Sequence, residues 1–430
     1  MDASRVIIPT VDLAKEYNMG KWKKHEAGKI GVELEEAVAM IQAAVCAVTE
    51  TERVNLLEAD GRMLAEDIAA DFDNPPFARS PLDGYACRSK DTKGAGAENP
   101  VRLRTVETVY AGTCPQKEIG KMEAARIMTG APMPVGSDCV VRLEDVTVLE
   151  KEILLPLELK EFQNYCFSGE DFKKGTVLAA KGAKITYVEQ GIIASAGRAE
   201  VLVYRKPRIG LLVTGDEVTE PGKPLTGGKI YGSNLHLLYG RLKELGADVD
   251  CYAQSLDTPE TVAETIRNWA MKVDAVITTG GVSVGDKDIF HQVFPILGAK
   301  RLFWKVRLKP GTPAMFSMYQ GTPVLSLSGN PFAAITTLEL LGKPLLASLS
   351  GDSSLQFRHR KAVLSTGFLK ASPRRRFLRG IYKDGQVRLP ETDAHSSGIL
   401  SSMCGCNCLV DVKGGEKALE AGQIVEIVVL

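Results

Sequence analysis

The sequence lacks a net charge, a signal-peptide core and a long uninterrupted apolar run. Its 53 lysine and arginine residues balance 53 aspartate and glutamate residues, so the overall composition gives no support for a nucleic-acid partner. The amino end carries VIIPT followed by KWKKH, and no apolar run is long enough to span a bilayer. These absences predict a soluble, cytoplasmic protein with no nucleic-acid partner and no membrane anchor.

The sequence also lacks a regular cysteine pattern. Its nine cysteines show no close pairing, which indicates reduced thiols rather than a disulfide framework. Cys404, Cys406 and Cys408 alternate at the period of a strand and would share one face. A soft-metal site is conceivable there, but three small buried residues are the stronger interpretation.

A chain of 430 residues exceeds what one hydrophobic core usually serves, so we expect several domains of α/β and β type. A helix is predicted from Val32 to Val48, and we expect it to pack with a turn-rich piece that resumes helical spacing at Tyr187 to Ser195. The expected parts are an amino-terminal extension (1–28), a helical linker domain from discontinuous segments (29–52 and 165–205), a small β domain (53–164), a three-layer α/β domain (206–350) and a C-terminal β-barrel or sandwich (351–430).

Strands and helices alternate from Arg208 onward. Strands are predicted at 209–213, 249–253, 273–278 and 323–327, and helices at 235–245, 260–271, 289–297 and 332–341. This alternation predicts a mostly parallel sheet with right-handed crossovers. Four polar loops, TGDE, SLDT, GGVSVGDKD and SGNP, each follow a strand. They should therefore open at one edge of the sheet, where such folds bind ligands.

The loop after the strand at 273–278 is rich in glycine. Gly280, Gly281 and Gly285 lie between that strand and the next helix, where backbone amides and the helix dipole can hold a phosphate or pyrophosphate. Asp286 and Asp288 follow, and one can cap the helix while the other faces a cation or substrate. A plain strand-to-helix turn is the competing interpretation, because a glycine-rich turn is a weak signal by itself.

Several separated motifs together resemble one family. From about Ile30 to Leu430 the chain is similar to the molybdopterin molybdenumtransferases, which comprise the bacterial MoeA proteins and the carboxyl-terminal domain of gephyrin. The order and spacing of seven motifs carry this resemblance: SPLDGYA (80–86), RIMTGAP (126–132), GED (169–171), TGDE (214–217), GGVSVGDKD (280–288), KPG (309–311) and GNP (329–331).

The resemblance implies a homodimer, with a dimerisation role for the linker domain and a molybdopterin-binding role for the α/β domain. It also implies a reaction in which adenylylated molybdopterin and molybdate give molybdenum cofactor and AMP, with Mg²⁺ as the usual cation. The implied functional partners are an upstream molybdopterin adenylyltransferase and downstream molybdoenzyme maturation factors.

The resemblance assigns site residues by motif. Catalytic roles fall to Asp83, Thr129, Asp171, Asp257 and Asp288, and metal binding to Glu217, Asp257 and Asp288. Substrate binding falls to Gly280, Gly281, Ser283, Gly285, Lys305, Lys309, Ser328, Asn330 and Pro331. The residue types at these positions suit the substrate and the cation. Lysines and backbone amides suit a pyrophosphate, and hard carboxylate oxygens, with that of Asp216 among them, suit magnesium.

The sequence departs from the family pattern at charged positions. No basic residue lies within Asn164 to Asp171, Ser328 stands where proline is common, and Thr312 replaces a lysine. Fewer charges near an anionic substrate would lower its affinity or change its orientation. These departures keep open a tungstate-selective paralogue and a weakly catalytic dimeric scaffold. A molybdopterin adenylyltransferase also stays open, because in the family that the chain resembles the same type of α/β domain serves both steps. A nicotinamide dehydrogenase fits poorly, because GGVSVG lacks the required glycine spacing.

Overall fold

The chain forms two compact units. The computed structural model describes residues 28–282, 289–368, 370–390, 395–416 and 418–430. One unit comprises the described parts of Met1–Glu52 with Gly61–Met63 and Tyr204–Leu430, and the other comprises Arg53–Asp60 and Leu64–Val203. Apart from Gly28, the expected amino-terminal extension falls outside the described residues.

A seven-stranded sheet forms the centre of the first unit, in the order β1-β17-β19-β20-β16-β12-β15. Its neighbours pair in parallel except where β19 runs antiparallel to β17 and β20, which confirms the mostly parallel sheet. The strands are β1 (Lys29–Val32), β12 (Arg208–Thr214), β15 (Asp248–Ser255), β16 (Ala275–Thr279), β17 (Lys300–Val306), β19 (Met315–Tyr319) and β20 (Thr322–Leu327), with a separate pair, β13 (Val218–Thr219) and β14 (Ile230–Tyr231).

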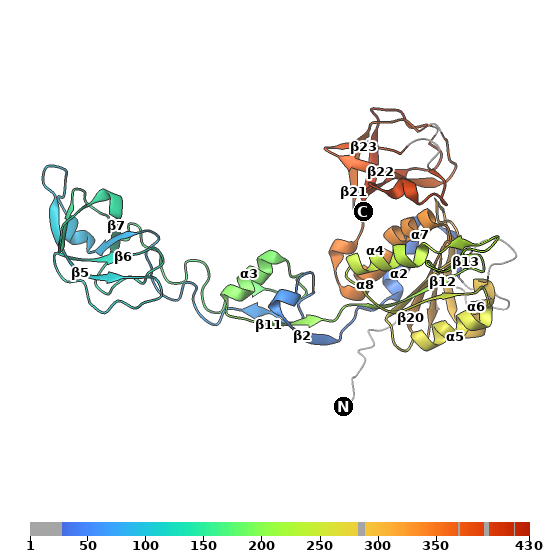
Figure 1. Ribbon diagram of the computed structural model, residues 1–430, viewed down its shortest axis with the longest axis horizontal. Helices are drawn as coiled ribbons and strands as arrows, with labels where there is room; N and C mark the ends of the chain where they lie inside the picture. Colours follow the sequence, from blue (N-terminus) through green and yellow to red (C-terminus); the bar gives the residue numbers. More distant parts are fainter. Residues whose placement is uncertain (1–27, 283–288, 369, 391–394, 417) are drawn as a thin grey trace. The chain divides into compact units, whose positions relative to one another are not determined.

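Helices cover both faces of this sheet, as a three-layer domain requires (Figure 1). One face carries α2 (Leu34–Ala44), α4 (Asn234–Glu244), α7 (Pro331–Thr337), a π-helical turn (Leu338–Gly342) and α8 (Lys343–Ser350). The other carries α5 (Pro259–Trp269) and α6 (Phe290–Leu297). In α5, Val262, Ala263 and Ile266 make one buried stripe, so helical periodicity predicted this layer correctly.

Contrary to the expectation from the sequence, the stretch from Pro331 to Ser350 is long and apolar enough, by length and composition alone, to cross a membrane. In the structure 94% of that window is buried inside the protein. Leu338, Leu341 and Leu345 belong to the main core cluster, so this apolar stretch packs as a core helix.

The helix near Val32 packs differently from the expectation. Leu34, Ala37 and Ile41 join the core cluster of the α/β domain, and β1 just before them pairs with β17. The sequence shows the buried stripe of this helix but not the surface against which it packs, because periodicity identifies a face and not its partner.

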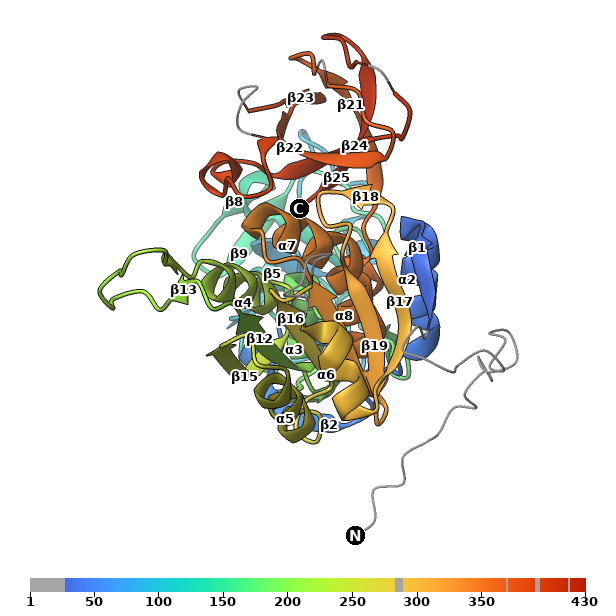
Figure 2. The same ribbon diagram turned by 90° about the vertical axis from the view of Figure 1, so that its right-hand side faces the viewer.

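The C-terminal segment closes into a small barrel (Figure 2). Its five strands are β21 (His359–Leu364), β22 (Arg375–Lys383), β23 (Gln386–Arg388), β24 (Cys408–Val412) and β25 (Ile424–Val429), and pairing of β22 with both β23 and β24 closes the ring. The short strand β18 (Leu308–Lys309) pairs with β22 from outside. Of the three alternating cysteines only Cys408 is buried, since Cys404 is exposed and Cys406 is half-buried. The prediction of three buried residues on one face was therefore wrong.

Two parts of the second unit have hydrophobic clusters of their own. A six-stranded sheet comprises β4 (Gly84–Cys87), β5 (Val101–Val109), β6 (Glu123–Ile127), β7 (Cys139–Arg142), β8 (Thr147–Val148) and β9 (Glu152–Leu155). The other part lies around α3 (Tyr187–Ser195), with the two-stranded sheets β3 (Ile68–Ala69) with β10 (Val177–Ala179) and β2 (Thr51–Asn55) with β11 (Glu200–Tyr204). Leu56, Leu64 and Ile68 pack there with Ile185 and Ile193, rather than with the six-stranded sheet as expected.

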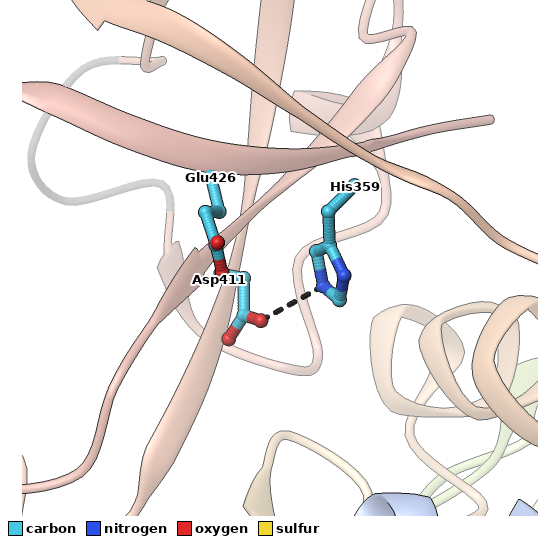
Figure 3. A group of neighbouring side chains, drawn as sticks. All are labelled: His359, Asp411 and Glu426. Carbon is cyan, nitrogen blue, oxygen red and sulfur yellow. Dashed lines mark hydrogen bonds and ion pairs between the residues drawn. The ribbon is translucent and has the colours of Figure 1, made fainter.

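A buried carboxylate, Asp411, organises charges on the barrel. Its oxygens accept hydrogen bonds from Arg375 at 2.8 and 2.6 Å, and His359 Nε2 lies 3.0 Å away (Figure 3). Lys413 lies 3.4 Å from Asp411 and 2.9 Å from Glu426. Burial alone would raise the pKa of Asp411, but the hydrogen bonds and charge of Arg375, with Lys413 and His359, outweigh it and lower that pKa.

His359, Asp411 and Glu426 are also the one group of three metal-ligand side chains found close together in the described part of the chain. Their ligand atoms lie within 4.8 Å of one another. The cations Arg375 and Lys413 already occupy the carboxylate oxygens and would repel a metal ion. We therefore interpret this group as an ion-pair network.

We predict that Asp411→Asn lowers the free energy of unfolding of the barrel by about 3 kcal/mol at neutral pH, because it leaves Arg375 without its buried partner. Since folding lowers the pKa of Asp411 below its ordinary value of 3.8, the stabilisation is complete above that value and is lost as pH falls through the lowered pKa. Chemical denaturation between neutral and acid pH measures both effects.

Asp250→Asn is the matched control, because Asp250 and Arg208 form an exposed pair expected to contribute less than about 1 kcal/mol. Equal loss of stability in acid by the wild type and Asp411→Asn would contradict the assignment.

Candidate functional site

A pocket of about 1430 Å³ opens in the first unit at the carboxyl ends of the parallel strands. Each of the four polar loops contributes to its lining, for example through Glu217, Asp257, Gly281 and Asn330. This confirms that the loops open at one edge of the sheet. Its size suits a ligand larger than a single phosphate.

Two glycines let the loops at the pocket approach each other. Gly280 has φ +95°, and a Cβ built there would lie 2.1 Å from the carbonyl oxygen of Thr214. A Cβ on Gly329 would lie 3.3 Å from the Cα of Gly280. The strand-end loops therefore pack backbone against backbone, which leaves main-chain groups near the pocket surface.

Side chains beneath the loops hold them in register. Asn234 Nδ2 donates to the carbonyl of Gly329 at 2.7 Å and to Thr279 Oγ1 at 3.1 Å. Thr279 Oγ1 in turn donates to the carbonyl of Ser328 at 2.8 Å. Ser328 thus contributes through its backbone to a buried network, in which Asn234 is a positioning residue.

Carboxylates gather on one side of the pocket. Glu217 and Asp257 line it, and Asp216 accepts the backbone N–H of Asp257 at 3.1 Å. Oδ1 of Asp257 is buried and makes no hydrogen bond. Burial raises the pKa of Asp257, and the negative charges of Asp216 and Glu217 add to this and outweigh the nearby polar groups of Thr214 and Asp216. Such a group gains when a cation binds beside it.

Cations line the same pocket. Lys305, which has φ +65°, holds its Nζ 4.0 Å from the centroid of the Trp304 ring, and Lys309 is exposed on β18. The barrel adds three more, Lys370, Arg374 and Arg376. Within the described ranges none of these five forms an ion pair with a carboxylate. The pocket therefore presents unpaired positive charge to an anionic ligand.

The barrel contribution was missed from the sequence. The run of Arg374, Arg375 and Arg376 resembles a solvated basic surface by composition, and only closure of the barrel beside β18 brings two of the three to the pocket. Ser397 also reaches it, where its hydroxyl oxygen lies 3.1 Å from Asn330 Nδ2.

The remaining assigned residues lie elsewhere or outside the description. Asp83, Thr129 and Asp171 belong to the second unit. There Asp83 Oδ1 accepts the backbone N–H of Thr129 at 2.7 Å and its hydroxyl at 2.8 Å, and these bonds lower the pKa of Asp83. Asp171 accepts from Asn74 Nδ2 at 2.9 Å. Ser283, Gly285, Asp286 and Asp288 fall outside the described residues.

The arrangement can therefore hold a polyanion and a divalent cation side by side. Gly280, Gly281 and Gly329 border the pocket, and both cations and carboxylates belong to its lining. Phosphate groups with a bound cation have this charge pattern.

Comparison with known proteins agrees with the motifs. Three family models match: "MoeA N-terminal region (domain I and II)" over residues 32–197, "Probable molybdopterin binding domain" over 210–348, and "MoeA C-terminal region (domain IV)" over 361–430.

Named relatives match nearly end to end. The molybdopterin molybdenumtransferase of Bacillus subtilis (strain 168) is 36% identical over 387 residues, which are 89% of this chain and 90% of the relative. That of Staphylococcus aureus (strain COL) is 34% identical over 403 residues, 92% of this chain and 95% of the relative. The crystal structure of the molybdopterin biosynthesis MoeA protein from Pyrococcus horikoshii OT3 is 29% identical, with a TM-score of 0.80 over 93% of this chain and 100% of that one. The chain therefore belongs to the MoeA family.

Proposed function

We propose that this protein is a cytoplasmic molybdopterin molybdenumtransferase that inserts molybdate into adenylylated molybdopterin and releases AMP. The observation that carries the proposal is the large pocket, whose lining includes unpaired cations, two carboxylates and the strand-end glycines. The named relatives support the choice of substrate.

The substrate pyrophosphate would lie against the backbone at Gly280 and Gly281. Lys305 and Lys309 would neutralise its charge, and Asn330 and Pro331 begin α7 beside it. An oxygen of the bound molybdate or of a water attacks the terminal phosphate of molybdopterin. The bond from that phosphate to the phosphoryl group of AMP breaks, and AMP leaves as its anion. The lysines stabilise the charge that develops on these oxygens.

Glu217 and Asp257, with Asp288 from the same motif set, would hold Mg²⁺. The buried, unpartnered Oδ1 of Asp257 fits a hard cation. When bound, Mg²⁺ would polarise the phosphate oxygens and favour AMP as the leaving group.

We further propose a homodimer, together with an upstream molybdopterin adenylyltransferase and downstream molybdoenzyme maturation factors as functional partners. The family membership supports both proposals. Size-exclusion chromatography with light scattering tests the first of them.

We predict that purified protein releases AMP from adenylylated molybdopterin in the presence of Mg²⁺ and molybdate. Parallel reactions with tungstate and with no oxyanion rank the two metals and measure the background. Tight substrate binding without any oxyanion-dependent AMP release would contradict the transferase and favour a scaffold, whereas formation of adenylylated molybdopterin from ATP would favour an adenylyltransferase.

We predict that Asp257→Asn weakens Mg²⁺ binding by about tenfold, because it removes a charged ligand. Since folding raises the pKa of Asp257, its ionised carboxylate lowers the stability of the folded, metal-free protein. The variant should therefore melt no lower than the wild type at neutral pH without metal.

Wild-type Mg²⁺ affinity should also decrease as pH falls through the raised pKa, because protons then compete with the cation. Calorimetric titration and thermal melts measure these effects, with Asp250→Asn as the control. Unchanged Mg²⁺ affinity in Asp257→Asn would remove Asp257 from the metal site.

We predict that Lys305→Ala or Lys309→Ala weakens binding of adenylylated molybdopterin by about tenfold, through loss of a charged hydrogen bond. Lys272→Ala is the matched control, because Lys272 is exposed just before β16, at the opposite end of that strand from the pocket. Equal affinities of the Lys305 and Lys272 variants would contradict the phosphate role.

A further inference from the structure

His395 lies on the wall of the pocket and has an unsatisfied nitrogen. It belongs to the pocket lining, and its ring meets the Phe368 ring edge to face, with centroids 5.1 Å apart. Nδ1 of His395 is buried and has no hydrogen-bond partner. A buried polar atom without a partner costs free energy, so a ligand that supplies one is favoured.

The charged groups around His395 are cations. Burial lowers the pKa of His395, and the charges of Arg379, Lys370 and Arg376 from the barrel lower it further, against a hydrogen bond with the backbone of Pro390. Lys305 and Lys309 line the same pocket from the α/β domain, and Glu217 and Asp257 are the described carboxylates in that lining. Glu391 and Asp393 lie outside the described residues. Protonation of His395 therefore adds one more cation to a crowded group.

Arg379 holds the loop that carries His395. It is fully buried, its guanidinium carbon lies 3.5 Å from the centroid of the Phe332 ring, and it donates to the carbonyls of Ser396 at 2.7 Å and of Ile399. Burial lowers the pKa of Arg379 to about 10, so it stays charged at neutral pH. No carboxylate of the described chain pairs with it, and its charge acts on the pocket without compensation.

We propose that His395 is a proton-linked anion contact, neutral in the empty pocket and protonated when a tetrahedral oxyanion or phosphate group binds beside it. The anion supplies the negative charge that the surrounding cations lack, and the imidazolium donates a hydrogen bond to an anion oxygen. The proton comes from solvent, and no covalent bond changes. The inference rests on the proposed function, because it concerns the anionic substrate of the same pocket.

The proposal gives His395 a role in affinity rather than in catalysis. Where anion binding takes up a proton, affinity decreases as pH rises, by up to about tenfold per pH unit for one linked proton. A histidine that only packs against Phe368 would leave the pH dependence of binding unchanged. Proton uptake therefore separates the two roles.

The test is calorimetric titration of the full-length protein with molybdate, and separately with AMP, in buffers of different ionisation enthalpy between about pH 6 and pH 8. The two probes distinguish an oxyanion contact from a phosphoryl contact. His395→Gln keeps a hydrogen-bond donor but cannot titrate in this range. The difference between the wild type and this variant cancels the titration of the probe itself.

We expect wild-type protein to take up as much as about one more proton per bound anion than His395→Gln, for one of the two probes. Exposed His236 is the matched control, and His236→Gln should keep the wild-type uptake. Equal proton uptake by wild type and His395→Gln with both probes would overturn the proposal. The titration needs no turnover. Failure of AMP release would therefore refute the proposed function, whereas only equal proton uptake would refute the role of His395.

Discussion

The close approach of two backbone loops determines the functional end of this protein. A Cβ added to Gly329 would lie 3.3 Å from the Cα of Gly280, and one added to Gly280 would lie 2.1 Å from the carbonyl oxygen of Thr214. Asn234 and Thr279 join the same loops by buried hydrogen bonds. Because β12, β16 and β20 run parallel, their polar ends must appear together. The pocket follows from this arrangement, and the barrel beside β18 completes its wall.

The cations and the carboxylates that line the pocket form no ion pair with one another in the described part of the chain. Five cations line the pocket without carboxylate partners among the described residues, while Asp257 is half-buried beside Asp216 and Glu217. Each group is unfavourable by itself, because like charges repel and burial removes water. A polyanion with its divalent cation satisfies both groups together. We infer that the protein gives up stability here for binding, as functional sites commonly do.

Much of the α/β domain could be predicted from the sequence, because buried strands such as 275–279 and striped helices such as α5 have clear patterns. Strand β17 could not, since lysines and an arginine in KRLFWKV obscure its alternation. The position of α2 could not be predicted either, because a buried stripe does not show which surface the helix packs against. His395 and the barrel cations are distant in sequence from every motif, and only the tertiary fold brings them to the pocket.

A crystal structure of the protein with AMP, molybdate and Mg²⁺ bound would test the central claim most directly. The account predicts phosphate density within hydrogen-bonding distance of the backbone at Gly280 or Gly281 and of Lys305 or Lys309, with Mg²⁺ on Asp257. Ordered ligands bound only outside this pocket would contradict it.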